Sequence, residues 1–172
     1  MKNEIRKKYL LVRKMINNKS EKDNIIYNKV INNKQVIDSE QVLIYVSMKE
    51  EIDTRRLINY FLMNKRVAVP RVEGNIINFY YIRSMNDLCE GTYNILEPRG
   101  NDMVVDFNKT VAITPLICYS LSGYRIGYGK GYYDRFYQKN NMYKIGLGYK
   151  ECLVENINNN EYDIKMDEII TD

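Results

Sequence analysis

Residues 42–62, VLIYVSMKEEIDTRRLINYFL, contain the strand, loop and helix from which we predict the fold class. Residues 42–46 are apolar and rich in β-branched side chains, as is typical of a buried strand. A helix follows, capped at its start by Asp53 or Thr54. The apolar side chains that it buries are those of Leu57, Phe61 and Leu62. A strand, a loop and a helix in this order form the repeating unit of α/β proteins.

The rest of the chain continues this alternation. A strand is predicted at 67–69, and it ends, or reaches a sheet edge, at Pro70. Turn residues at 73–75 precede a returning strand at 76–82, so a hairpin is predicted. Residues 91–100 are predicted to form a loop. Further strands are predicted at three places, 111–114, 144–148 and 169–170, the last of them at an edge. We therefore predict a three-layer α/β/α sandwich with a mixed, partly parallel sheet.

Two helices are predicted before the first strand. In residues 2–17 the apolar side chains recur at helical spacing, and Arg13 lies on another face, where a charged side chain is usually solvated. Ser20 and Asp23 form a capping-box pattern ahead of the second helix. Asn32-Asn33 is predicted to end that helix.

Length and composition indicate a soluble globular protein. The chain has 172 residues, 45% of them hydrophobic and 28% charged, which suits one domain over residues 1–172. No apolar run is long enough for a membrane span, and the Lys-rich start lacks the apolar core of a signal peptide. The three cysteines, Cys89, Cys118 and Cys152, are isolated, so we expect a reducing, cytoplasmic location.

The chain contains no histidine. This excludes Ser-His-Asp and Cys-His nucleophile schemes as well as histidine-based zinc sites. Any catalysis must use carboxylates, lysine, arginine, tyrosine, backbone donors or a bound metal. The net charge of +4 leaves open both an anionic small molecule and weak nucleic-acid binding.

The glycine-rich residues 122–137, SGYRIGYGKGYYDRFY, are the first candidate for a ligand site. Glycines alternate here with Tyr128 and Lys130 ahead of a predicted helix, so backbone N–H groups can face a bound anion. Lys130 adds a mobile positive charge, and Asp134 could hold a divalent metal beside phosphates. The spacing matches neither a P-loop nor the dinucleotide fingerprint. On pattern alone, a tight strand-to-helix turn whose glycines serve only geometry is an equal alternative.

Glu51 is a second candidate. It lies in the loop that follows the strand at 42–46, and ligands of open α/β sheets bind at the carboxyl ends of strands. For Glu51 taken alone, a solvated loop carboxylate is the favoured interpretation.

Several short blocks then occur in one order along nearly the whole chain. They are a basic first helix with Lys2 and Arg6, Ser47-Met48 before Glu51-Ile52-Asp53-Thr54, Val69-Pro70-Arg71-Val72, Glu97-Pro98, Arg125 to Asp134, and Tyr162-Asp163 with Asp167 and Thr171. In these blocks the chain resembles the 5-formyltetrahydrofolate cyclo-ligase family, also called methenyltetrahydrofolate synthetases. The resemblance favours a functional role for the glycine-rich stretch over a purely geometric one.

The resemblance implies a reaction that uses ATP and magnesium to close 5-formyltetrahydrofolate into 5,10-methenyltetrahydrofolate, releasing ADP and phosphate. A formyl amide carbon is a poor electrophile and its oxygen a poor leaving group. Transfer of the γ-phosphoryl group to that oxygen solves both difficulties, and a folate nitrogen can then attack. The enzyme needs no nucleophile of its own, which suits a chain without histidine.

The resemblance also implies roles for individual residues. Lys130 and Arg125 would stabilise the transferring charge, and Asp134 and Asp163 would hold magnesium. ATP would contact Lys2, Arg6, Arg125, Ile126, Gly127, Tyr128, Gly129, Lys130, Gly131, Tyr132 and Tyr133. The folate would contact Val46, Glu51, Tyr93, Tyr128 and Tyr132. Because the chain has 16 tyrosines, each of these could equally be an ordinary packing residue.

Two positions depart from the family pattern. Tyr119-Ser120 stands where the family commonly has Phe-Asp, which weakens any role for position 120. Tyr162-Asp163 stands where the family usually has His-Asp, which suggests that the histidine is not an obligatory acid or base.

Two other classes of function remain as alternatives. Tyrosines beside basic residues could stack on single-stranded nucleic acid, but the positive charge is small and spread along the chain, so we expect no nucleic-acid partner. An ATP-binding regulatory protein without turnover is disfavoured because Asp134 and Asp163 are both present. We expect a monomer that acts on a small molecule, with no membrane partner.

Overall fold

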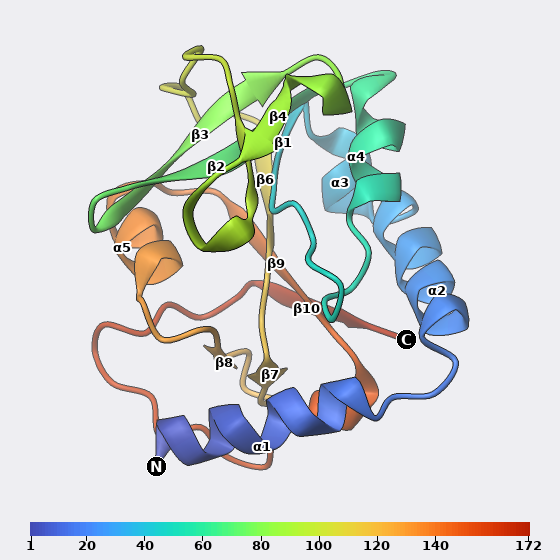
Figure 1. Cartoon of the computed structure of the whole chain (residues 1–172), viewed down its shortest axis with the longest axis vertical. Helices are drawn as coiled ribbons and strands as arrows, with labels where there is room; N and C mark the ends of the chain where they lie inside the picture. Colours follow the sequence, from blue (N-terminus) through green and yellow to red (C-terminus); the bar gives the residue numbers. More distant parts are fainter.

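A six-stranded sheet forms the centre of the structure, a computed structural model that describes residues 1–172 (Figure 1). In spatial order its strands are β10 (Glu168–Thr171), β9 (Tyr143–Gly148), β6 (Thr110–Thr114), β1 (Gln41–Ile44), β2 (Arg66–Glu73) and β3 (Ile76–Ile82). All neighbouring strands are parallel except β2 and β3, which form the predicted hairpin. The predicted α/β fold with a mixed, partly parallel sheet is confirmed.

Helices cover both faces of the sheet (Figure 1). One face packs against α2 (Lys19–Ile31), α3 (Lys34–Asp38) and α4 (Arg55–Leu62), and the other packs against α5 (Tyr132–Lys139). The first apolar cluster includes Ile26, Val36 and Phe61 from the three helices, and the second includes Phe136 from α5. Burial of apolar side chains in both clusters is the main favourable contribution to folding.

Strand β1 explains why residues 42–46 form a continuous apolar run. All four residues of the strand are buried, and successive side chains point to opposite faces. Val42 and Ile44 belong to the cluster under α2 to α4, whereas Leu43 belongs to the cluster under α5. A strand with helices on both faces has no solvated side, so its sequence does not alternate between apolar and polar residues.

Helix α1 (Lys2–Lys14) lies across the carboxyl ends of the parallel strands (Figure 1). It contacts the segments that follow β6 and β9, since Arg13 donates to Leu116 O and Tyr9 donates to Leu153 O. Four short strands complete the fold as two small hairpins: β4 (Leu88–Glu90) with β5 (Leu96–Pro98), and β7 (Cys118–Tyr119) with β8 (Arg125–Ile126). Three 3₁₀ turns lie at η1 (Met85–Asp87), η2 (Thr92–Asn94) and η3 (Lys150–Cys152). None of the helices combines the length and apolar character that a membrane span requires.

Gly148 at the carboxyl end of β9 allows the segment after β6 to pack closely on that strand. A Cβ atom at this position would lie 2.8 Å from the ring of Tyr119. Real Cβ contacts are longer than this, so any larger residue would push β7 away from β9. The absence of a side chain therefore helps to place the β7–β8 hairpin and the loop that follows it.

The helix predictions need three corrections. Arg13 is not solvated: it is 5% exposed, because α1 turns this side toward the protein. Ser20 does not cap the second helix, which already begins at Lys19 after Asn18 and has no side-chain cap bond. Asn32 ends α2 as predicted, but the Asn33 side chain then caps the unpredicted helix α3 by accepting two backbone N–H bonds.

Two strand boundaries also differ from the prediction. Pro70 does not end β2, which continues to Glu73 in register with β3, but it does lie at a local sheet edge, the alternative that the sequence also predicted. The strand tolerates proline because β1 pairs with β2 only as far as Ala68, so one side of β2 has no paired strand at Pro70. Residues 91–100 are not all loop, since β5 pairs with β4. The sequence did not predict β5 because a strand of three residues is too short for alternation between apolar and polar side chains to mark it.

Candidate active site

A cavity of about 490 Å³ opens at the carboxyl end of the sheet, and 24 residues line it. Its volume is in the range of small-molecule sites. Every residue that the sequence analysis placed in the site contributes to this lining: Lys2, Arg6, Val46, Glu51, Tyr93, Arg125, Ile126, Gly127, Tyr128, Gly129, Lys130, Gly131, Tyr132, Tyr133, Asp134 and Asp163. These residues come from α1, the loop after β1, the loop after η1 and β4, the segment from β8 to α5, and the loop before β10. The fold therefore brings distant parts of the sequence to one place.

The glycine-rich loop lies against the first turns of α1. The Nε–H of Arg6 donates to Gly127 O at 2.7 Å, so the guanidinium group holds the loop at its start. Gly129 has φ of +91°, and a Cβ atom there would lie 3.1 Å from Cζ of Arg6. Glycine is required at this position by both its backbone conformation and the approach of the arginine. The loop then enters α5 at Tyr132.

Two carboxylates and two cations are bonded together in the cavity wall. Asp134 accepts from Nη1 of Arg125 at 3.0 Å and from the N–H of Ile164 at 3.0 Å. Asp163 pairs with Nζ of Lys2 and also accepts a backbone N–H bond. Because Ile164 directly follows Asp163, its bond to Asp134 brings both carboxylates to the same part of the site.

The two carboxylates suit a hard divalent cation. No group of three or more acidic or cysteine side chains gathers anywhere in the structure, so an all-protein cage is absent. Asp134 and Asp163 offer hard oxygen atoms from two side chains. Magnesium is usually held by one or two carboxylates, with phosphate oxygens and water completing its shell. The two residues therefore fit an ion that binds together with a phosphorylated ligand.

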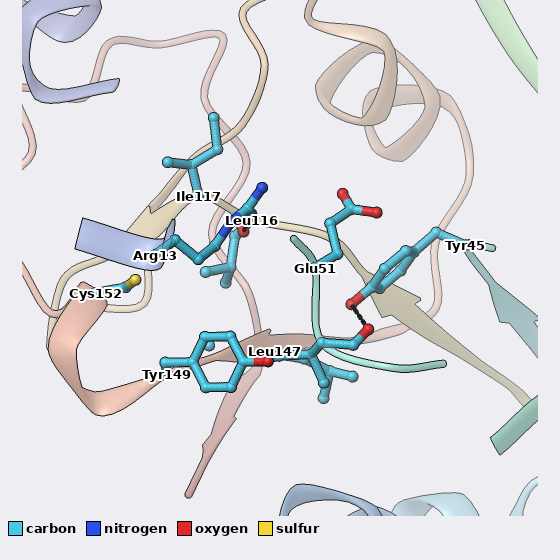
Figure 2. A pocket seen from close by; sticks show the side chains of 10 residues that line it. Arg13, Tyr45, Glu51, Leu116, Ile117, Leu147, Tyr149 and Cys152 are labelled. Carbon is cyan, nitrogen blue, oxygen red and sulfur yellow. Dashed lines mark hydrogen bonds between the residues drawn. The ribbon is translucent and has the colours of Figure 1, made fainter. Parts of the chain in front are cut away.

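Glu51 is buried, with 6% of its surface exposed, so the expectation of a solvated carboxylate is wrong (Figure 2). Oε1 accepts from the hydroxyl of Tyr128 at 2.9 Å, and Oε2 accepts from the N–H of Met48 at 2.8 Å. Burial raises the pKa of Glu51, while the bonds from Met48 and Tyr128 and the charge of Arg13 oppose that rise. The loop between β1 and α4 thus holds a single, oriented carboxyl group at the cavity.

Tyr128 presents its ring to the cavity and its hydroxyl to the protein. The residue is 42% exposed, yet its hydroxyl donates to Glu51 and accepts from Nη2 of Arg13 at 2.7 Å. Burial of this end raises the pKa of Tyr128 to about 12. The hydroxyl therefore stays protonated at neutral pH and remains a donor to Glu51.

The rim of the cavity carries the more exposed predicted residues. Tyr93 is 56% exposed and has φ of +60°, which is unusual for a bulky residue. Nζ of Lys130 lies 5.7 Å from the centre of the Tyr93 ring, within the range of a cation–π contact. The nearby Tyr93 hydroxyl raises the pKa of Tyr132, whose own hydroxyl donates to Gly74 O at 3.5 Å. Lys130 thus has no carboxylate partner and is available to a ligand.

Sequence analysis did not assign roles to several residues that line the cavity. They are Tyr45, Met48, Pro70, Val72, Ile77, Ile95, Glu97 and Pro115. Four of them lie in blocks that carry the family resemblance, so the order of those blocks was an available signal. Ile77, Ile95 and Tyr45 are ordinary apolar or aromatic residues, and no local pattern marks them. Only the packing of the β2–β3 hairpin and the β4–β5 hairpin brings such side chains to the site.

The two positions that depart from the family pattern lie outside the cavity lining. Ser120 is buried and its hydroxyl bonds the hydroxyl of Ser122 at 2.8 Å. Tyr162 is 64% exposed. Its backbone N–H donates to Asn160 and its backbone oxygen accepts from Gln138, but its side chain makes no hydrogen bond. Neither side chain contributes to the site in this structure.

The geometry defines an α/β protein with a cavity of small-molecule size at the carboxyl ends of its strands. A sequence profile of the 5-formyltetrahydrofolate cyclo-ligase family matches residues 1–172, and the chain belongs to this family. The solved structure of a 5,10-methenyltetrahydrofolate synthetase from Aquifex aeolicus is 30% identical, with a TM-score of 0.88 over 99% of this chain and 89% of that one.

Two curated relatives agree with this assignment. A probable 5-formyltetrahydrofolate cyclo-ligase of Caenorhabditis elegans is 38% identical over 65 residues, which cover 34% of this chain and 32% of the relative. The 5-formyltetrahydrofolate cyclo-ligase of Escherichia coli (strain K12) is 31% identical over 116 residues, covering 62% of this chain and 63% of the relative. The chain therefore aligns with less than two thirds of each of these relatives.

The positive φ of Gly129 can be tested by substitution. Gly129→Ala is expected to lower the free energy of unfolding by about 1–3 kcal/mol, because alanine is strained at a positive φ and meets the Arg6 guanidinium. Urea denaturation measures this change. The matched control is Gly127→Ala, where a Cβ atom meets nothing within 4 Å, and it should stay within about 0.5 kcal/mol of the parent. Equal losses in both variants would contradict the proposed constraint.

Proposed function

We propose that this chain catalyses the ATP- and magnesium-dependent cyclisation of 5-formyltetrahydrofolate to 5,10-methenyltetrahydrofolate, with release of ADP and phosphate. The observation that carries the proposal is that one cavity collects every residue assigned to ATP, magnesium and folate. Membership of the cyclo-ligase family supports the same reaction. We further propose a monomer that works in the cytoplasm and acts on a small molecule, which the size of the cavity suits.

In the proposed reaction the formyl oxygen attacks the γ-phosphorus of ATP, and the bond from that phosphorus to the bridging oxygen of ADP breaks. The formyl carbon becomes electrophilic because its oxygen is now part of a good leaving group. The neighbouring folate N–H nitrogen attacks this carbon, closes the ring and releases its proton to solvent. Phosphate then departs with the carbon–oxygen bonding pair, and the ring nitrogen lone pair forms the new double bond.

The basic residues of the cavity suit the phosphoryl step. Lys130 reaches the rim without a carboxylate partner, so its charge can stabilise the transferring group. Arg125 and Lys2 pair with the carboxylates Asp134 and Asp163. A magnesium ion held by these carboxylates would neutralise phosphate charge. Arg125 and Lys2 would then be free to bind phosphate oxygens. Arg6, one turn further along α1, would bind phosphate oxygens as well.

The folate would occupy the part of the cavity that Glu51 and Val46 line. An ionised Glu51 can accept bonds from the amino and ring N–H groups of the pterin. Val46 would pack on the ring, and Tyr128 and Tyr132 would line the folate side with Tyr93 at the rim. Catalysis in this scheme comes from positioning and charge stabilisation, because the enzyme forms no covalent intermediate.

The direct test is to incubate the purified chain with 5-formyltetrahydrofolate, ATP and magnesium. The absorbance of the methenyl product should appear, with one ADP and one phosphate formed for each product molecule. Omitting ATP should abolish the signal, because the formyl oxygen is then never activated. Folded protein that forms no cyclised product under these conditions would contradict the proposed function.

Lys130→Ala and Asp134→Asn should each lower turnover about a hundredfold or more, because each removes a preorganised charge that acts on the phosphoryl group. Initial rates of product absorbance measure the loss, and circular dichroism checks that the fold is intact. Lys139→Ala is the matched control: Lys139 is exposed on α5 and does not line the cavity. Near-parental turnover in Lys130→Ala or Asp134→Asn would remove that residue from the mechanism.

Glu51→Gln should raise the KM for the folate about tenfold or more while changing the KM for ATP little, because bonds to a charged acceptor are lost only on the folate side. Glu50→Gln is the control, since Glu50 precedes Glu51 in the chain but does not line the cavity. A larger effect on ATP than on folate would place Glu51 outside the pterin site.

A further inference from the structure

Arg13 is a buried cation without a carboxylate partner. It is 5% exposed, and it takes part in none of the ion pairs of the structure. Nη1 donates to Leu116 O at 3.2 Å and Nη2 donates to the Tyr128 hydroxyl, while Nε is buried without a hydrogen-bond partner. Burying a charge in this way is costly unless another charge compensates it nearby. This arrangement needs an explanation beyond the stability of α1.

The nearest compensation reaches Arg13 through one hydroxyl group. Tyr128 accepts from Nη2 of Arg13 at 2.7 Å and donates to Oε1 of Glu51 at 2.9 Å. The three groups form a directed chain from a cation, through a hydroxyl, to an anion. Such a chain polarises its middle member, so each of its bonds is stronger than it would be alone. Three segments far apart in the sequence supply the three residues.

Arg13 and Glu51 also line one small cavity of about 10 Å³ (Figure 2), which shares Tyr45 and Glu51 with the large one. This space is close to the volume of a single water molecule, so bulk solvent does not screen the two charges there. The other titratable or charged groups around Glu51 come from α2, β1's carboxyl end and α5. Besides Arg13 and Tyr128, these groups are Lys19 on α2, Tyr45 after β1 and Tyr133 on α5.

We propose that Arg13 is a positioning residue that keeps Glu51 ionised and oriented toward the folate cavity, acting through the hydroxyl of Tyr128. The consequence of Arg13 for folate binding rests on the proposed function. The effect of Arg13 on Glu51 is a property of the ligand-free protein. Arg13 itself does not line the large cavity, so it would act without touching the substrate.

The direction of the effect follows from the environment of Glu51. Burial raises the pKa of Glu51, and the Tyr128 bond and the charge of Arg13 lower it. An ionised Glu51 accepts bonds from pterin N–H groups, so this contribution is present above the pKa and is lost as pH falls through it. Without Arg13, less opposes the rise in the pKa of Glu51 that burial causes. The loss on acidification should then occur at a higher pH.

The test follows the Glu51 carboxyl carbon by ¹³C NMR during a pH titration of the ligand-free protein, with the signal assigned from Glu51→Gln. The midpoint should move to higher pH in Arg13→Met, which keeps an apolar side chain but removes the charge. Lys14→Met removes the same charge from the exposed neighbouring position of α1 and should leave the midpoint unchanged. The pH below which folate binding weakens should move with the Glu51 midpoint in each variant.

A second variant keeps the proposal falsifiable if Arg13→Met does not fold. Tyr128→Phe retains both charges but removes the hydroxyl between them, and it should also move the Glu51 midpoint to higher pH. An unchanged midpoint in whichever of these variants folds would overturn the proposal. Failure of the proposed function looks different: the midpoint would still move, but the parent protein would form no cyclised folate.

Discussion

One face of α1 fixes the geometry of the site. Lys2, Arg6, Tyr9 and Arg13 follow each other at spacings of four, three and four residues, so they lie along one side of the helix. Each donates a hydrogen bond to a different segment at the carboxyl end of the sheet. The acceptors are Asp163, Gly127 O, Leu153 O and Leu116 O, and Arg13 also reaches the Tyr128 hydroxyl. The helix thereby holds together loops that the sheet alone would leave independent.

This constraint has a physical origin in the sheet. Both faces are covered by helices, so the carboxyl edge is where loops from β1, β6 and β9 meet. Such an edge presents polar backbone groups that need partners when they are buried. Long side chains from a helix laid across the edge satisfy some of these groups. The same helix brings two cations, Lys2 and Arg6, to the cavity wall.

The charges of the site are arranged in two linked groups. In the first, Lys2 pairs with Asp163 and Arg125 pairs with Asp134, so opposite charges balance before any ligand is bound. The second group joins Arg13 to Glu51 through Tyr128. A chain without histidine has no side chain that changes charge near neutral pH unless burial shifts a pKa. Burial raises the pKa of Glu51, a carboxylate that lines the cavity.

The sequence by itself determined the α/β class, the strand–loop–helix unit at residues 42–62 and the glycine-rich loop, because these features depend on local periodicity and backbone freedom. The family blocks also contain the residues predicted for the site, apart from Val46 and Tyr93. Only the tertiary structure decided that Arg13 and Glu51 are buried, that Pro70 continues a strand, and that the Tyr128 hydroxyl joins α1 to Glu51. The reason is that burial and pairing depend on which distant segments meet, and a helix face that looks solvated in the sequence can lie against the edge of a sheet.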